Sequence, residues 1–157
     1  MGRVDTTDPA EPRRPSKFSS TAVTMSKIPF RNPGELQRIK AIAGSAADGP
    51  IIMLNLNRYK EVCEFPDGAL YSRYMNALDE LLHKVGAKAL WRANVMGQAA
   101  GEQAIDEVLA VWYPSHQAFL DMPQQPGADI NYRLRQECVA EATIHRCPGN
   151  RTPLDGS

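Results

Sequence analysis

GPIIMLNLNRY, residues 49–59, is the stretch from which we predict the fold, because it reads as the first strand of a sheet. The breaker pair Gly49 and Pro50 precedes an apolar run whose residues alternate between two faces. One face takes Ile52, Leu54 and Leu56, and the other takes Met53, Asn55 and Asn57. A buried amide without a hydrogen-bond partner costs about 1–3 kcal/mol. Asn55 is therefore expected either to be held in a polar network or to line a cavity.

Length and charge argue against several classes of protein. The 157 residues suit one domain with a buried core, and 18 basic residues balance 18 acidic ones. Since no basic run is present either, we expect no nucleic-acid partner. No apolar stretch reaches the roughly 18–20 residues that cross a bilayer, and the N-terminus has no apolar signal region. These features predict a cytoplasmic protein without a membrane segment.

The three cysteines, Cys63, Cys138 and Cys147, are an odd number and form no CxxC pair. This pattern favours a reducing compartment over a disulfide framework, so we expect small core or surface residues. His145 and Cys147 are the nearest pair of metal-ligand type, and two residues do not make a zinc site. We expect neither a metal nor a cofactor.

The sequence predicts that the chain is divided into three segments. Residues 1–27 carry three prolines, three arginines and almost no large apolar side chains, so we expect a disordered N-terminal tail. Met25 could be the natural start of the protein. A transit peptide is the rival interpretation, although this segment is more acidic than such peptides usually are. Residues 28–147 form the predicted domain, and residues 148–157 form a C-terminal tail.

Periodicity within the domain predicts alternating strands and helices. Strands are expected over 50–59, 89–96, 107–113 and 140–147, and helices over 33–43 and 69–85, after Ser115, and along the stripe of Ile130, Leu134 and Cys138. After the first helix, this β-α-β-β-α-β order is typical of the ferredoxin-like sandwich, an α+β fold. Its four-stranded antiparallel sheet carries the helices on one face. The other face holds aromatic and apolar residues, so we expect it to form a homodimer.

Several of these segments resemble domain-of-unknown-function family 1330, a member of the dimeric α+β barrel superfamily. The resemblance covers roughly residues 32–147 and rests on residues 49–56, Tyr71 and Tyr74, Val85 and Gly86, Asp106 and Glu107, and Tyr113 to Ser115 with Phe119. Two positions depart from the family, namely His116, where members often have Arg, and residues 126–129, where a Pro-Glu-Tyr sequence is usual. The resemblance implies a barrel-forming dimer. It implies no reaction, because the superfamily includes monooxygenases, cyclases, isomerases and haem-degrading enzymes.

A candidate pocket follows from the predicted topology. Three strand segments and the two helices that cover them contribute its residues: Asn55, Tyr71, Tyr74, Trp91, Arg92, Tyr113 and His116. Aromatic walls with a few polar groups suit a small, flat organic ligand. The competing interpretation makes the tyrosines and Trp91 ordinary core residues. Arg92 is then a salt-bridged edge residue instead of an anchor for a carboxylate or phenolate.

Our first functional hypothesis is a cofactor-free protein that binds a small aromatic or apolar carbonyl compound and catalyses proton transfer or oxygenation. Asn55 and Arg92 would hold the oxygen atoms, and His116 or a tyrosine would move the proton. The alternative functions are a non-catalytic ligand-binding or assembly module and a haem enzyme. For His116 itself, the alternative is a solvent-exposed position without a function. Whether the protein is an enzyme stays open. Asp106 and Glu107 are neighbours in a strand and face opposite sides, so we expect turn and edge roles for them.

Overall fold

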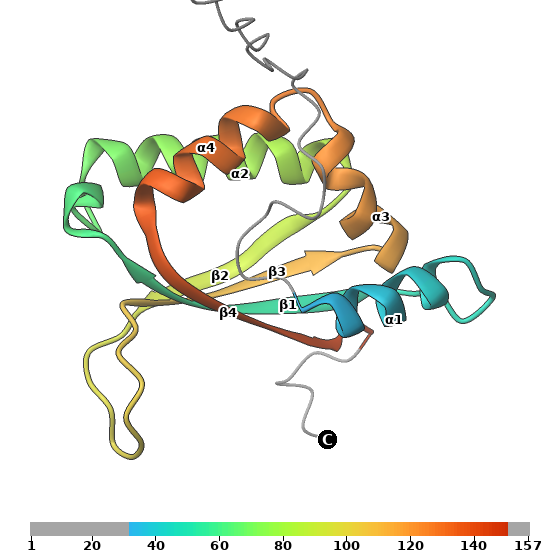
Figure 1. Cartoon of the computed structure of the whole chain (residues 1–157), viewed down its shortest axis with the longest axis horizontal. Coiled ribbons are helices and arrows are strands. Elements are labelled where there is room, and N and C mark those ends of the chain that lie inside the picture. The colour runs from blue at the N-terminus through green and yellow to red at the C-terminus, as the bar shows by residue number, and fades with distance from the viewer. Residues whose placement is uncertain (1–31, 151–157) are drawn as a thin grey trace, which may run out of the picture.

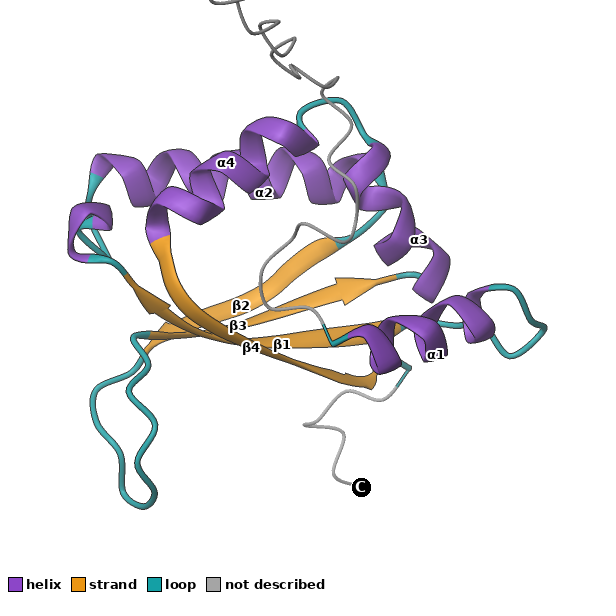
Figure 2. Cartoon of the chain, viewed as in Figure 1, coloured by secondary structure: helices purple, strands orange, loops and turns teal. Residues whose placement is uncertain are grey.

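A computed structural model describes residues 32–150 and confirms the predicted α+β sandwich over that range (Figures 1 and 2). Its four strands are β1 (Ile51–Tyr59), β2 (Lys88–Asn94), β3 (Glu107–Tyr113) and β4 (Val139–Pro148). The strands pair antiparallel in the order β2-β3-β1-β4, the ferredoxin-like arrangement. The predicted tail over 1–27 lies outside the described residues. β4 continues to Pro148, one residue beyond the predicted end of the domain.

The helices are α1 (Pro33–Ala43), α2 (Ala69–Lys84), α3 (His116–Asp121) and α4 (Ala128–Cys138), with short 3-10 helices η2 (Glu61–Cys63) and η3 (Met122–Gln124). Figure 2 shows α2, α3 and α4 on the same side of the sheet. Two predicted N-caps are confirmed. Asn32 Oδ1 accepts from the backbone N–H of Gly34 at 3.1 Å, and Ser115 Oγ accepts from that of Ala118 at 3.0 Å.

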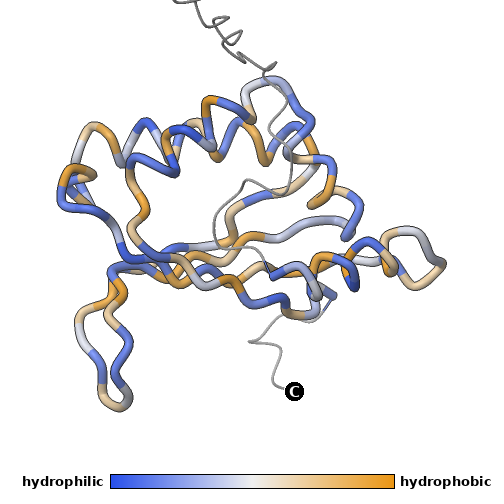
Figure 3. The backbone as a smooth tube through the Cα atoms, viewed as in Figure 1, coloured by the Kyte–Doolittle hydropathy of each residue, from blue (hydrophilic) through white to orange (hydrophobic). Residues whose placement is uncertain are grey.

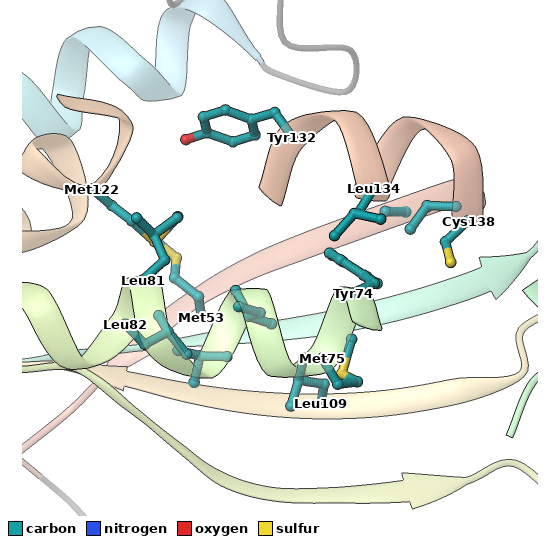
Figure 4. Close-up of a cluster of buried hydrophobic side chains, with 14 of the residues drawn as sticks. Met53, Tyr74, Met75, Leu81, Leu82, Leu109, Met122, Tyr132, Leu134 and Cys138 are labelled. Carbon is teal, nitrogen blue, oxygen red and sulfur yellow. The ribbon is translucent and has the colours of Figure 1, made fainter. Parts of the chain in front are cut away.

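The first predicted strand lies in the middle of the sheet, between β3 and β4. Its alternation is confirmed, because Met53, Asn55 and Asn57 are buried toward the helices. The amphipathic stripe of α2 packs on that same side, and Figure 3 shows hydrophobic residues recurring along this helix. The side chains in this layer form the hydrophobic core of the domain (Figure 4).

The opposite face of the sheet bears the other set of strand residues. Leu54 of β1 lies there beside Ala110 of β3 and His145 of β4, and Trp91 of β2 is 49% exposed. Within the described residues the sheet is open and is not closed into a barrel. The connection between β2 and β3, residues 95–106, extends away from the helices past this face (Figure 1).

The sequence-based expectation of unpaired thiols is wrong for two of the three cysteines. Cys63 of η2 and Cys138 at the end of α4 form a disulfide with a Cα–Cα distance of 4.9 Å, and both are fully buried. They are core residues, as expected, but their separation of 75 residues gave no spacing signal for the pairing. Cys147 is free.

Residues 32–150 contain neither a helix suited to cross a membrane nor a cluster of metal-ligand side chains. No helix in this range is long and apolar enough to cross a membrane. No group of three or more His, Cys, Asp or Glu side chains in the same range could hold a metal ion.

Candidate functional site

The seven predicted pocket residues lie in four separate places instead of one pocket. Asn55, Tyr74 and Tyr113 line a small cavity between the sheet and the helices. Tyr71 and Arg92 lie at a cluster around Glu107, and His116 belongs to a third group near α1. Trp91 lies on the opposite face, because it pairs with Ala110 while Arg92 pairs with Leu109. Neighbouring strand residues point to opposite faces, so these two side chains do not share a site.

The cavity between the helices and the sheet has a volume of about 70 Å³. Its polar lining consists of Asn55, Tyr74, Tyr113, Asn131, Tyr132 and Arg135. Its remaining walls are apolar and come from β1, β3, α2 and η3. Figure 4 shows Met53, Tyr74, Met122 and Tyr132 of this lining in the layer between the helices and the sheet. We call this space the inner cavity.

Asn55 is held in the polar network that the sequence suggested as one of two possibilities, and it also lines the cavity. Its Nδ2 donates to the carbonyl oxygens of Met53 at 3.0 Å and Leu109 at 3.4 Å. An amide nitrogen has two protons, so both are used within the sheet. This corrects the expectation that Asn55 donates to a ligand oxygen, since only its Oδ1 remains and that atom accepts.

Two residues with donor side chains that the sequence pattern did not indicate, Asn131 and Arg135 of α4, line the inner cavity. Asn131 is 2% exposed, and its Nδ2 has no hydrogen-bond partner in the described chain. Arg135, one turn later, is partly buried and donates to the Tyr74 hydroxyl at 3.0 Å. The predicted stripe of α4 began at Ile130, which is 54% exposed. The predicted Leu134 and Cys138 are buried, and the buried stripe also includes Ala128, Asn131 and Tyr132. A hydrophobic pattern alone could not reveal its polar members.

Glu107 corrects the expectation of an edge role. It is 1% exposed and accepts from the Tyr59 hydroxyl at 2.6 Å, from the Tyr71 hydroxyl, and from Asn57 Nδ2 at 3.4 Å. Burial first, and then the neighbouring Glu107, raise the pKa of Tyr59 and of Tyr71 above the ordinary range for tyrosine.

Arg92 lies beside this cluster. Burial works to lower the pKa of Arg92, but Tyr71, Asp79 and Glu107 together hold it above its ordinary value. Arg92 also forms a salt bridge with Asp79 at 3.5 Å on the edge strand, as the competing interpretation expected. These groups bind one another, so the cluster is a polar network of the core, although the buried Oδ1 of Asn57 in it has no hydrogen-bond partner among the described residues.

His116 is buried, which corrects the alternative that it faces solvent. Its Nδ1 lies 2.8 Å from Asp48 Oδ1, and its Nε2 lies 3.2 Å from an Arg146 nitrogen. Arginine can only donate, so Nε2 accepts and Nδ1 carries the proton. Both ring nitrogens are therefore occupied, and neither is open to a substrate as a general base. Arg146 also donates from Nε to Glu35 at 2.6 Å.

A larger, open cleft of about 350 Å³ lies between α1, α3 and β4, and we call it the outer cleft. Ile39, Phe119 and Ile144 supply apolar walls, while Glu35, Arg38 and Arg146 supply charged ones. Met53 lines both this cleft and the inner cavity. A single flexible side chain therefore contacts both spaces.

Two solved structures are similar to this chain. One is RPA0582, a protein of unknown function from Rhodopseudomonas palustris, with a TM-score of 0.63 and 24% identity over 78% of this chain and 96% of that chain. The other is the methylated RPA0582 protein, with a TM-score of 0.63 and 25% identity over 78% and 94%. No protein-family model and no curated protein matches the chain. The likeness confirms the fold, and nothing in it bears on a ligand or a reaction.

Proposed function

We propose that this protein binds a small aromatic or apolar carbonyl compound, with the carbonyl oxygen in the inner cavity. The observation that carries the proposal is the Nδ2 of Asn131, which is buried without a partner among the described residues and belongs to a residue that lines the cavity. A buried, unpaired donor costs about 1–3 kcal/mol. A bound carbonyl oxygen would remove that cost. The resemblance to domain-of-unknown-function family 1330 is consistent with the proposal.

The body of the compound needs more room than 70 Å³ provides. The outer cleft has that room, because about 350 Å³ falls within the usual size of small-molecule sites. Met53 separates the two spaces, and methionine side chains adapt readily to new neighbours. In our proposal the carbonyl end lies in the inner cavity, and the apolar body extends past Met53 toward Ile39 and Phe119.

Binding is better supported than catalysis. Among the described residues, the lining of the inner cavity includes no His, Asp or Glu. Proton transfer there would have to use a tyrosine hydroxyl, such as that of Tyr74. We therefore favour the ligand-binding module over the cofactor-free enzyme, and we keep a cytoplasmic location as part of the proposal.

A titration of the full chain with acetophenone and with ethylbenzene tests the binding site, because the two molecules differ by one carbonyl oxygen. NMR-detected binding of acetophenone should be about tenfold tighter, which is the effect of one buried hydrogen bond. Asn131→Leu should abolish the difference, and Gln136→Leu, an exposed amide on the same helix, should preserve it. Equal affinity of the wild-type protein for both molecules would contradict the proposal.

We also propose a homodimer formed through the face of the sheet opposite the helices. Leu54 lies near the centre of that face, and the exposed Trp91 adds apolar surface that no helix of residues 32–150 covers. Light scattering should give twice the chain mass of 17.3 kDa. Leu54→Asp should give a monomer, while Arg133→Asp on the exposed side of α4 should not. A monomeric wild-type protein would refute the dimer.

A further inference from the structure

The guanidinium of Arg135 has no acidic partner among residues 32–150. The arginines of the described residues that form ion pairs are Arg38, Arg58, Arg92 and Arg146, and Arg135 is in none of these pairs. Its Nη1 donates a hydrogen bond to the neutral hydroxyl of Tyr74 at 3.0 Å. A charge removed from water is costly unless a partner compensates it. Arg135 therefore lines the inner cavity as an uncompensated cation.

Burial does not neutralise this group. Loss of water works to lower the pKa of Arg135, but Tyr74, Tyr59 and Tyr132 hold it above the ordinary value for arginine. Arginine stays protonated in proteins at any physiological pH. The positive charge at the cavity is thus permanent.

Two further donors belong to residues around the same cavity. Asn131 Nδ2 has no partner, and Tyr74 uses its hydroxyl oxygen to accept from Arg135, so it keeps its own proton to donate. Asn131 and Arg135 are one helical turn apart, which places them on the same face of α4. Three residues that carry a charge, an amide N–H and a hydroxyl therefore line one space of about 70 Å³.

We propose that the inner cavity recognises the carboxylate group of a small monocarboxylic acid, with Arg135 as its counter-ion and Asn131 and Tyr74 as hydrogen-bond donors. This rests on the proposed function, because it names the chemical class of the carbonyl compound. A space of about 70 Å³ suits a carboxylate group and leaves little room for the rest of the molecule. With one cation among apolar walls such as Leu78 and Val111, a monoanion is balanced and a dianion is not.

The test compares benzoate with benzamide on the full chain at pH 7. The two molecules have nearly the same shape and share the carbonyl, so they differ in charge and in one group, which is an acceptor oxygen in benzoate and an NH2 with two donor protons in benzamide. Benzoate should bind about tenfold tighter or better, as for a hydrogen bond to an ionised acceptor. Arg135→Met should reduce the ratio of the two affinities to about one, and Arg135→Lys should keep part of it. Arg133→Met, an exposed arginine on the same helix, should leave the ratio unchanged.

Asn131→Asp gives a second measurement that does not depend on how Arg135 variants fold. It places an internal carboxylate one helical turn from Arg135, so benzoate binding should be lost while benzamide still binds. Equal binding of benzoate and benzamide to the wild-type chain would overturn the carboxylate proposal and leave the carbonyl site standing. If neither benzoate, benzamide nor acetophenone binds, the proposed function itself is wrong.

Discussion

Asp48 holds the start of α3 with one carboxylate, because its Oδ1 lies 2.7 Å from the His116 backbone nitrogen and 2.8 Å from Nδ1 of the same residue. Its Oδ2 accepts from the backbone N–H of Gln117 at 3.3 Å. The first N–H groups of a helix have no partner within the helix, so this carboxylate satisfies two of them. A residue of the loop after α1 thus fixes the position of α3.

These contacts predict how stability depends on pH. Burial works to raise the pKa of Asp48, but the hydrogen bonds from His116 and Gln117 outweigh it and hold the pKa below its ordinary value. A group with a lowered folded-state pKa stabilises the fold above its unfolded pKa, and this contribution is lost as the pH falls through the folded pKa. Asp48→Asn should therefore cost about 1 kcal/mol near pH 7, and the cost should shrink toward zero in acid.

Urea unfolding of both proteins from pH 7 down to about pH 2 measures this. Asp67→Asn, at an exposed turn, serves as the control and should cost little at any pH. A difference between wild type and Asp48→Asn that stays constant over the whole range would show that ionised Asp48 is not the stabilising form.

The Glu107 cluster predicts a large loss of stability. Glu107→Ala leaves the hydroxyls of Tyr59 and Tyr71 without their acceptor inside the core. We expect a loss of about 3–5 kcal/mol in the free energy of unfolding, and a smaller loss for Glu107→Gln, which keeps one carbonyl oxygen. Glu102→Ala, in the exposed connection between β2 and β3, should change it by less than about 0.5 kcal/mol. A Glu107→Ala protein as stable as wild type would rule out this role.

The disulfide between Cys63 and Cys138 predicts how many free thiols each chain has. All three cysteines lie in the described residues, and two of them are joined. Titration of the denatured, unreduced protein should therefore find one thiol per chain, that of Cys147. Closing a loop of 75 residues restricts the unfolded chain, so reduction should lower the free energy of unfolding by about 2–4 kcal/mol. Three thiols per chain would instead show that Cys63 and Cys138 are not joined in the protein.

The fold could be predicted from sequence because its signals are local. The alternation through Met53 and Asn55, the Ser115 cap and the stripe of α2 each depend on neighbours along the chain. The site could not be predicted in the same way. Asn131 and Arg135 line the inner cavity because of how α4 packs on the sheet, and the sequence pattern does not indicate that packing. The hydrophobic spacing placed Leu134 and Cys138 correctly in the core, but it included the exposed Ile130 and could not indicate the polar members of the buried stripe.

Partners that are distant in the sequence also explain why the predicted pocket residues lie in four separate places. The residue types of Tyr71, Tyr74 and His116 suit a ligand, but their partners come from distant segments. Tyr71 is hydrogen-bonded to Glu107, and Tyr74 is hydrogen-bonded to Arg135. The two ring nitrogens of His116 are hydrogen-bonded to Asp48 and Arg146. Sequence alone gives no sign of these pairings, because they join positions 30 to 68 residues apart.

Met53 provides a test of how a ligand would reach the inner cavity. It lines both the inner cavity and the outer cleft, whereas Met122 lines the inner cavity and not the cleft. Met53→Ala should join the two spaces, while Met122→Ala enlarges the inner cavity without opening it to the cleft. Each variant should lose about 2–5 kcal/mol of stability, so the comparison between them is matched. Acetophenone should then raise the thermal midpoint of Met53→Ala by several degrees more than that of Met122→Ala, because it binds the joined space more tightly. Equal shifts in the two variants would mean that the ligand body does not pass Met53, and that the outer cleft is separate from the binding site.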